Sequence, residues 1–329
     1  MQKVNCAQLI EKAVALLNNN EVSYVLGWKK GEFDYDVTPT LFKDEKSVRE
    51  GLIYSDFCGI NLSKYLVSKT KEVEGKILVF LKPCDTYSFN QLLTEHRFNR
   101  ERVYAVGISC EGMVDAGKVK AACPDAISSI EEKENSIVVN TIYDEALELC
   151  KDDVLLEKCI SCKSKKHVAY DELLGQDGEV IDSNRFDEVA RIEKMSSEER
   201  YEYWQNELSK CIRCNACRDA CPACTCEKCV FDNPNSGVEN KSPSNEFEEK
   251  LFHIIRAFHV AGRCTDCGEC SRACPQNIPL HLLNRKFIKE IDECYGKYQA
   301  GEEVDQRNPL VNYTFDDMEP HEVFEKGDN

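Results

Sequence analysis

The sequence predicts an α/β domain at the N-terminus, followed by a mainly α-helical domain that is rich in cysteine. Two continuous apolar segments, 76–81 and 103–108, lie about twenty residues apart in the first part of the chain, with a helical pattern between them. After about residue 190, the chain carries twelve of its twenty cysteines and several amphipathic segments. We therefore expect domains at 1–190 and 191–298 and an acidic tail at 299–329.

The elements of the first domain follow from hydrophobic periodicity. Continuous apolar runs such as 76–81 and 103–108 are typical of strands buried on both faces. Asp85 suits the N-cap of the helix between them, and strand, helix and strand in this order favour a right-handed parallel crossover. Further elements are expected as a helix over 9–17, a strand over 22–28, and a hairpin within 126–140 that turns at Glu134 and Asn135.

The second domain is expected to be helical. Ser196 and Glu199 form a capping box that begins one helix, and Pro279 suits the first turn of the last one. A Pro/Asn/Ser-rich loop over 232–245 precedes a long helix between the two cysteine motifs described below. The apolar residues of that long helix recur at helical spacing: Phe247, Leu251, Ile254, Ile255 and Phe258.

Composition excludes several classes of function. The 42 basic and 59 acidic residues give a net charge of −17 without a basic cluster, so a nucleic acid would be repelled. The first twenty residues lack a continuous apolar signal segment, and no later run approaches a membrane span, so we expect a cytoplasmic protein without transmembrane segments. Disulfides are rare in a reducing cytosol, which favours metal ligation for many of the cysteines.

Two cysteine motifs give the strongest signal. CIRCNACRDACP (211–222) and CTDCGECSRACP (264–275) share the spacing Cys-x2-Cys-x2-Cys-x3-Cys-Pro. In two-cluster ferredoxins the first three cysteines of such a motif hold one 4Fe-4S cluster and the fourth holds the other cluster. The predicted ligands are therefore Cys211, Cys214, Cys217 and Cys274 for the first cluster, and Cys264, Cys267, Cys270 and Cys221 for the second.

Zinc is the alternative for these motifs, because paired CxxC sequences also bind zinc. Zinc knuckles use two short pairs, whereas this chain repeats a triplet followed by Cys-Pro, so we expect iron-sulfur clusters. The 43-residue step from Cys221 to Cys264 contains a predicted helix. In this respect the module resembles the α-helical ferredoxins of heterodisulfide reductases and succinate dehydrogenases. Such clusters move single electrons.

Four cysteines of the first domain lie at predicted strand ends or in the loops that follow. Cys84 follows the first strand, Cys110 follows the second, and CISCK supplies Cys159 and Cys162. None of these cysteines alone is specific evidence for a metal site, since a single cysteine at a strand end is more often a small buried side chain.

Together with KPCDTYSFNQLL, VGISCEGM and CISCKSKKHVAYDELLG, these cysteines give the chain a family resemblance over most of residues 70–295. It resembles the β subunits of hydrogenases and formate dehydrogenases that use coenzyme F420, together with sulfhydrogenase and anaerobic sulfite reductase relatives. The resemblance implies a third 4Fe-4S cluster held by Cys84, Cys110, Cys159 and Cys162, with Cys123 as a substitute ligand. In some members it also implies FAD, but no GxGxxG follows a strand to support a dinucleotide site independently.

The remaining candidates have structural interpretations. We expect the side chains of Cys6, Cys58, Cys150 and Cys294 to be packing residues, and we expect His253 and His259 to be ordinary structural histidines. Three further cysteines follow the first motif, and both sulfur-lined packing and a zinc site stay open for them: Cys224, Cys226 and Cys229. No catalytic constellation is recognisable.

These observations predict an electron-transfer subunit of an anaerobic oxidoreductase complex. Its partners would be other subunits, such as a formate dehydrogenase, a hydrogenase or a heterodisulfide-reductase-like flavoprotein. One alternative is an FAD-containing reductase that acts directly on a small substrate or a deazaflavin, and another is a zinc-binding interaction module.

Overall fold

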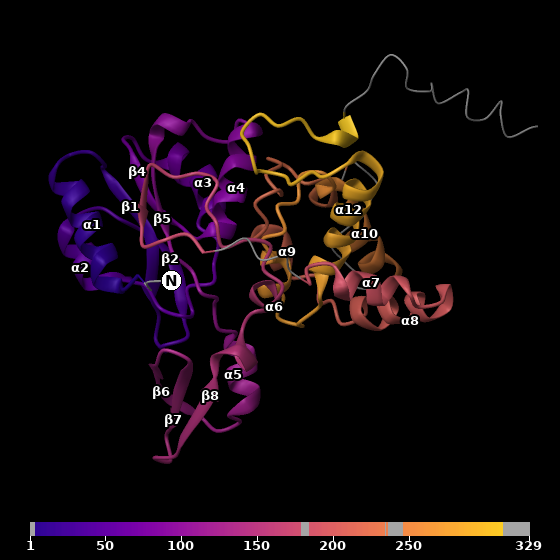
Figure 1. Cartoon of the computed structure of the whole chain (residues 1–329), viewed down its shortest axis with the longest axis horizontal. Helices are drawn as coiled ribbons and strands as arrows, with labels where there is room; N and C mark the ends of the chain where they lie inside the picture. The colour runs from indigo at the N-terminus through magenta and orange to yellow at the C-terminus, as the bar shows by residue number, and fades with distance from the viewer. Residues whose placement is uncertain (1–3, 179–183, 234, 236–245, 312–329) are drawn as a thin grey trace, which may run out of the picture.

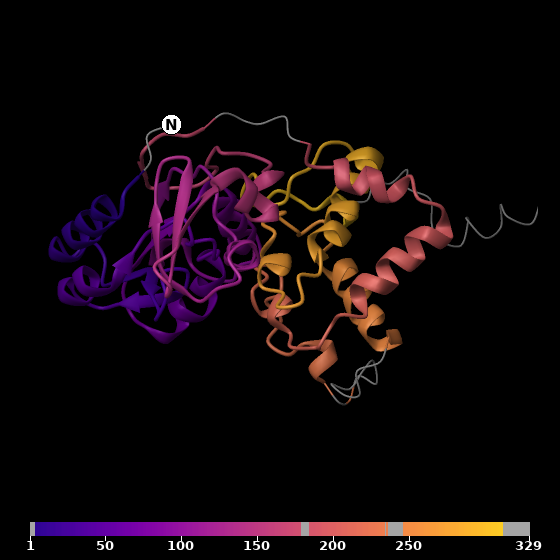
Figure 2. The same cartoon turned by 90° about the horizontal axis from the view of Figure 1, so that it is seen from below.

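A computed structural model describes residues 4–178, 184–233, 235 and 246–311. Figure 1 shows an α/β domain in indigo and purple beside a helical domain in orange and yellow, with a small separate sheet below them. The same division is visible from below in Figure 2. This arrangement confirms the predicted fold class. Within the described part of the chain, no helix is long and apolar enough to span a membrane.

The α/β domain is built on a six-stranded sheet. The strand order is β2, β1, β4, β5 and β9, and β3 pairs with β1 off this path. The strands are β1 (Tyr24–Lys30), β2 (Val37–Phe42), β3 (Leu52–Ile53), β4 (Ile77–Leu81), β5 (Val103–Ile108) and β9 (Glu172–Leu174). β1, β4, β5 and β9 run parallel, while β2 and β3 are antiparallel to β1. β4 is buried along its whole length, which confirms the prediction from its continuous apolar run.

The helices of this domain include α1 (Cys6–Asn18), α2 (Glu45–Gly51), α3 (Ser63–Glu72) and α4 (Pro83–Thr94). The predicted N-cap of α4 was wrong, because the helix begins at Pro83 with Lys82 as its N-cap. Proline suits the first helical position, which moves Asp85 to the third. There its carboxylate accepts the backbone N–H of Lys82 at 3.2 Å. The helix therefore starts with Cys84 in its first turn.

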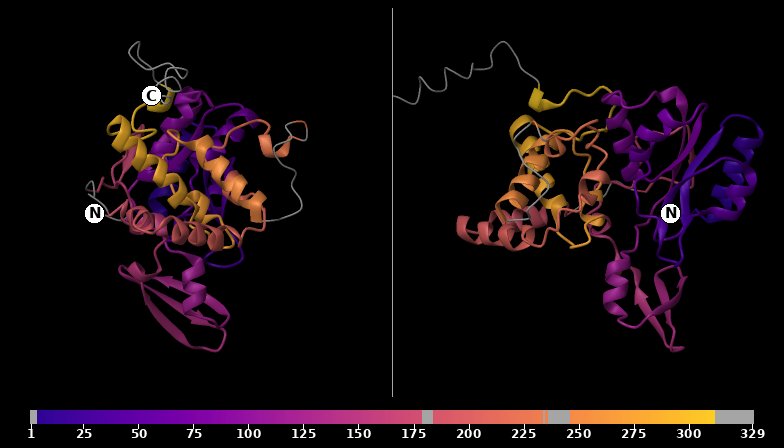
Figure 3. Two further views of the ribbon diagram at one scale, coloured as in Figure 1. Left: turned by 90° about the vertical axis from the view of Figure 1, so that its right-hand side faces the viewer. Right: turned by 180° about the vertical axis from the view of Figure 1, so that it is seen from behind.

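A second, three-stranded antiparallel sheet stands apart from both domains in the two views of Figure 3. It consists of β6 (Ile127–Glu132), β7 (Ser136–Thr141) and β8 (Ala146–Cys150), with α5 (Ala116–Ala122) beside it. The β6–β7 pair confirms the predicted hairpin. Its small core includes Val119, Ile137 and Val139. Cys123 is buried in this core, away from the other candidate ligands of the first domain.

The helical domain contains α7 (Asp187–Glu193), α8 (Ser197–Leu208), α9 (Ala216–Asp219), α10 (Glu246–Val260), α11 (Glu269–Arg272) and α12 (Leu280–Tyr295). The capping box of Ser196 and Glu199 is present at the start of α8, as predicted. Val189 and Ile192 of α7 pack against Leu282 of α12. α7 includes residue 190, the expected end of the first domain, and packs with the helices of the second domain. Most of the predicted loop, residues 234 and 236–245, lies outside the described residues.

The buried face of α10 differs from the predicted apolar face. Ile254 and Phe258 are 44% and 61% exposed, whereas His253 and Arg256 are 2% and 5% exposed. The reason is the position of the cysteine motifs, since the inner face of α10 lies against sulfur ligands and carries polar groups that can contact them. The side chain of Phe247 lies outside the described set.

The start of the predicted acidic tail, residues 299–311, lies against α4 of the first domain. The backbone carbonyl of Glu302 accepts a hydrogen bond from Asn90 at 3.4 Å, and the backbone N–H of Asp305 donates to Thr94 at 3.0 Å. Gly301 has a φ of +75°, and a Cβ there would lie 1.9 Å from the carbonyl oxygen of Tyr87. This close approach requires glycine. Residues 312–329 lie outside the described set.

Candidate metal centres

The two ferredoxin-like motifs have the same backbone conformation. In the first motif Arg213 and Asn215 have φ angles of 55° and 63°, and in the second Asp266 and Gly268 have φ angles of 54° and 66°. These residues occupy matching positions on either side of the second cysteine of each motif. Left-handed residues cost about 1–2 kcal/mol when they are not glycine, so three such residues indicate a fixed loop shape. Turns of this kind direct backbone N–H groups into a concave site for anions and iron-sulfur clusters.

Gly268 has a second reason to be glycine. A Cβ at this position would lie 2.4 Å from the Cβ of Lys158, which belongs to the first domain. The second motif is therefore packed closely against the α/β domain through its backbone.

The first group of cysteines combines both motifs. Cys211, Cys217 and Cys274 pack together, so the fourth cysteine of the second motif lies with the first motif. Cys214 is on the same loop and is exposed. The pKa of Cys217 is raised to about 12, mainly by burial; Arg256 opposes this increase, and Cys270, Cys211 and Cys274 contribute to it. Buried thiols of this kind become thiolates when they bind a cationic metal centre.

The second group is formed in the same way by the other four predicted ligands. Cys221 packs against Cys264. Burial raises the pKa of Cys264, Cys267 and Cys270, and the charge of Cys221 contributes to each increase. The fourth cysteine of the first motif therefore lies among the first three of the second motif. This reciprocal exchange is the ligand arrangement of two-cluster ferredoxins.

The donor set fits 4Fe-4S clusters, because each group offers four cysteines and a backbone shaped to receive an anionic cluster. Across residues 4–178, 184–233, 235 and 246–311, no three His, Cys, Asp or Glu side chains are close enough to hold a single metal ion. In a four-iron cube each cysteine binds a different iron atom, so its ligands stand farther apart than the ligands of one ion.

Two side chains of α10 reach these groups, and sequence analysis assigned neither a role there. The Nε2 atom of His253 lies 3.2 Å from the Sγ atom of Cys211. Arg256 donates from Nη2 to the carbonyl oxygen of Cys217 at 2.9 Å. The pKa of Arg256 lies well above its usual range; burial would lower it, but nearby cysteines, Cys221 first, raise it. Arg256 therefore places a buried positive charge beside both groups, where thiolate-ligated clusters carry negative charge.

The third set of predicted ligands gathers at the carboxyl edge of the parallel sheet. Cys84 lies in the first turn of α4, Cys110 follows β5, and Cys159 and Cys162 come from α6 (Glu157–Ile160) and the loop after it. All four line one pocket, and Cys267 of the second group lines it as well. Burial raises the pKa of Cys110 to about 12, with a further contribution from Cys159 and Cys162.

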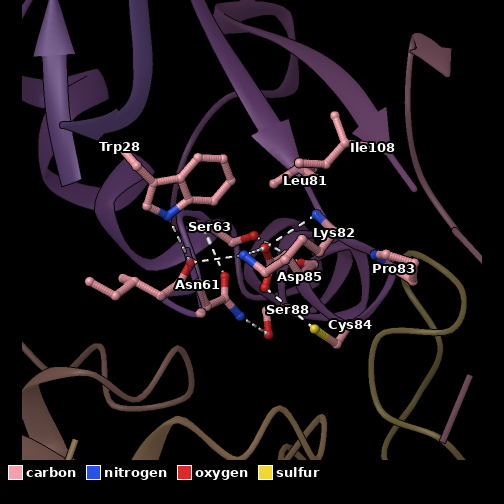
Figure 4. Close-up of polar contacts among 12 residues, drawn as sticks. Trp28, Asn61, Ser63, Leu81, Lys82, Pro83, Cys84, Asp85, Ser88 and Ile108 are labelled. Atoms are coloured by element: carbon pink, nitrogen blue, oxygen red, sulfur yellow. Dashed lines mark hydrogen bonds and ion pairs between the residues drawn. The ribbon is translucent and has the colours of Figure 1, made fainter. Parts of the chain in front are cut away.

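A buried ion pair supports the strand-to-helix turn that carries Cys84 (Figure 4). Lys82 and Asp85 are fully buried, and their charged atoms lie 2.9 Å apart. The Lys82 ammonium also donates to the carbonyl oxygen of Ile60 at 3.0 Å and lies 4.5 Å from the ring centre of Trp28. The turn contains no glycine, so it does not offer the close backbone approach that a dinucleotide phosphate needs.

Two buried ion pairs connect the second and third groups, one of them directly and the other through a hydrogen bond to Ser161. Lys158, next to Cys159, pairs with Glu269, which lies between Cys267 and Cys270. Their side chains are 5% and 1% exposed. Burial alone would raise the pKa of Glu269, but Arg272 and Lys158 lower it to about 2. The carboxylate is therefore charged at neutral pH and holds the two domains together.

The second pair is Arg285 and Asp266. Arg285 donates from Nε to both carboxylate oxygens of Asp266, at 2.8 and 3.0 Å, and from Nη1 to the Ser161 hydroxyl at 2.6 Å. Ser161 lies between Cys159 and Cys162, and Asp266 precedes Cys267. One guanidinium therefore connects the ligand loops of two cysteine groups.

The other cysteines divide by exposure. Cys58 is buried and Cys6 is partly buried, as packing residues should be, but Cys150 and Cys294 are exposed, so the packing interpretation was wrong for these two. β8 carries Cys150 at its solvent-facing end, and Cys294 lies on the outer side of α12.

The three cysteines after the first motif line a cavity of about 470 Å³: Cys224, Cys226 and Cys229. The backbone N–H of Cys224 donates to the carbonyl of Cys221 at 3.1 Å, which places it beside the second group.

Comparison with known proteins agrees with this geometry. The 4Fe-4S dicluster domain family matches residues 207–278. The F420-dependent formate dehydrogenase subunit beta of Methanocaldococcus jannaschii is 26% identical over 348 residues, covering 85% of this chain and 88% of that protein. The F420-dependent formate dehydrogenase 1 subunit beta of Methanococcus maripaludis is also 26% identical, covering 84% of this chain and 87% of that protein.

Two other matches are more limited. The succinate dehydrogenase iron-sulfur subunit of Bacillus subtilis is 30% identical over 96 residues, which cover 25% of this chain and 34% of that protein. Among solved structures, a chain of the F420-reducing [NiFe] hydrogenase complex of Methanosarcina barkeri aligns with a TM-score of 0.38 and 12% identity, over 49% of this chain and 59% of that chain. The chain is thus similar to F420-dependent formate dehydrogenase β subunits over 84–85% of its length, and its residues 207–278 match the 4Fe-4S dicluster domain family.

Proposed function

We propose that this chain is an iron-sulfur electron-transfer subunit of an oxidoreductase complex. The observation that carries the proposal is the reciprocal exchange of cysteines, in which Cys221 lies with the second motif and Cys274 with the first. Such an exchange fixes two clusters beside each other in one protein. A 4Fe-4S cluster supplies one-electron redox chemistry when bound, and the residues around it set its potential.

The ligands in this proposal are the two groups of four, with Cys84, Cys110, Cys159 and Cys162 as a third. The second group lies in the middle, because Cys267 borders the pocket of the third group and Cys270 packs with Cys217 and Cys274 of the first. The role of the protein is to hold the three ligand sets in this order. Arg256, Lys158 and Arg285 supply positive charge near them.

The partners in this proposal are other subunits of a redox complex, such as a formate dehydrogenase, a hydrogenase or a heterodisulfide-reductase-like flavoprotein. Support comes from the similarity to formate dehydrogenase β subunits over 85% of the chain. The first group offers a point of approach, because Cys214 and its neighbour Ile212 are exposed. An exposed ligand loop lets a redox partner come close to a cluster.

Metal, sulfide and flavin analysis of the anaerobically purified full-length chain tests the proposal. We expect about twelve iron and twelve sulfide per chain, because each of three cubes contains four of each. About eight iron atoms per chain would argue against a cluster in the third group, and fewer than about eight would overturn the assignment of two clusters. Zinc in place of iron would favour the interaction-module alternative. FAD released by acid would favour the reductase alternative, for which the glycine-free turn before α4 provides no support.

A further inference from the structure

His253 is the side chain that most directly contacts a predicted cluster ligand. It lies on the inner face of α10, is 2% exposed, and has its Nε2 atom 3.2 Å from the Sγ atom of Cys211. A T-shaped contact with the Phe252 ring, at 5.0 Å between ring centres, fixes the orientation of the imidazole. The contact is therefore built into the packed interior and does not depend on a mobile surface side chain.

The imidazole is a donor in this contact. A metal-bound thiolate carries no proton, so it can only accept a hydrogen bond. Within the described residues the Nδ1 atom of His253 has no hydrogen-bond partner. A neutral imidazole with its single proton on Nε2 satisfies the sulfur, whereas the other tautomer would turn two lone pairs toward each other.

The second group has a weaker counterpart. Asn284 donates from Nδ2 to the Sγ atom of Cys270 at 3.6 Å, which is longer than the His253 contact. The Cys224 side chain also hydrogen-bonds to Cys221 of the second group. His253 therefore provides the first group with an imidazole donor at 3.2 Å.

We propose that His253 donates a hydrogen bond to the Cys211 thiolate and thereby raises the midpoint potential of the first cluster. This inference rests on the proposed function, since it concerns the clusters assigned there. Reduction adds one negative charge to a cluster, and a donor to a ligand sulfur stabilises the more negative state. His253 is thus a positioning residue that stabilises the reduced state of the first cluster.

The test is an anaerobic redox titration of the full-length chain followed by EPR. In His253→Leu the donor is lost, and we expect the reduced-to-oxidised ratio of one cluster at a fixed potential to fall about tenfold, equivalent to about 59 mV. His253→Gln keeps an N–H near the Nε2 position and should return the potential toward the wild-type value. His259→Leu is the matched control, because His259 is on the same helix and is exposed. It should leave all potentials unchanged.

Unchanged midpoint potentials in an iron-loaded His253→Leu variant would overturn the inference, as would a His253→Gln variant shifted as far as His253→Leu. Should the Leu variant fail to bind iron, pulsed EPR of wild-type chain labelled with ¹⁵N-histidine supplies the second measurement. A weak coupling to one histidine nitrogen, absent in His253→Gln, supports the hydrogen bond, and no coupling overturns it. A wild-type chain without iron would overturn the proposed function and this inference together, whereas unshifted clusters overturn only the inference.

Discussion

Replacing Lys158 by methionine should loosen the junction between the two domains while leaving each domain folded. The Lys158 ammonium donates to the carbonyl oxygen of Gly59 at 2.7 Å and pairs with Glu269. Methionine keeps most of the apolar length of the side chain but removes both polar contacts. The charged Glu269 carboxylate then retains Arg272, with an Nη2 to Oε2 distance of 2.8 Å.

The magnitude follows from the environment of Glu269. Arg272 and Lys158 lower the pKa of Glu269 to about 2 against the opposing effect of burial, so the carboxylate strongly prefers its charged form. Breaking a buried ion pair costs about 3–5 kcal/mol. Because Arg272 stays in place, we expect a loss of about 3 kcal/mol, at the lower end of this range.

Hydrogen exchange measured by mass spectrometry gives a local measurement of this change. The backbone N–H of Asn61 donates to the Glu269 carboxylate at 3.3 Å. Exchange of this backbone proton therefore reports opening of the junction between the domains. About 3 kcal/mol corresponds to exchange that is faster by on the order of 100-fold. Lys133→Met is the control, because the Lys133–Glu148 pair is on the separate sheet and both side chains are more than half exposed. Exchange at Asn61 within threefold of wild type, with iron content retained, would refute the reasoning.

Two further predictions concern thiol reactivity and pH. In the iron-loaded chain Cys150 is exposed and should react with iodoacetamide. Cys58 should stay unmodified from pH 7 to 9, because burial raises its pKa to about 11. Rapid alkylation of Cys58 would contradict its burial. Glu95→Gln should destabilise the domain junction by about 1–3 kcal/mol at pH 7, because the Glu95 carboxylate accepts two hydrogen bonds from Arg263, at 2.8 and 2.6 Å. Burial would raise the pKa of Glu95, but Arg263 lowers it below its ordinary value of 4.5. The difference in Tm between wild type and Glu95→Gln should therefore be largest above about pH 4.5 and decrease as the pH falls below this value. A difference in Tm that does not depend on pH would argue against the charged pair.

The elements that the sequence predicted well are those that local pattern decides. The continuous apolar runs of β4 and β5, the β6–β7 turn and the capping box of α8 all depend on neighbouring residues. β9 has only three residues and acquires its place by pairing with β5, more than sixty positions earlier in the chain. A pairing over this distance leaves no periodic signal in so short a segment.

The cysteine groups show a similar division. Motif spacing predicts which cysteine crosses between the two motifs, because the three-residue step before Cys-Pro directs the fourth thiol away from the first three. The spacing could not reveal His253 and Arg256 on the inner face of α10. Hydrophobic periodicity assigns only apolar side chains to the interior. The buried face of α10 carries His253 and Arg256 beside apolar residues because it lies against the cysteines, to which these two side chains donate. The Lys158–Glu269 ion pair and the hydrogen bond from Arg285 to Ser161 were also not predictable, since each joins residues more than one hundred positions apart.

Reductive coulometry of the iron-loaded, full-length chain, monitored by EPR, tests most directly whether it holds redox clusters in three cysteine groups. Each 4Fe-4S cluster takes up one electron, so about three electrons per chain are expected. Uptake of about two electrons would agree with clusters in the first and second groups but would contradict a cluster held by Cys84, Cys110, Cys159 and Cys162. Uptake of fewer than two electrons would contradict the assignment of this chain as an iron-sulfur electron-transfer subunit.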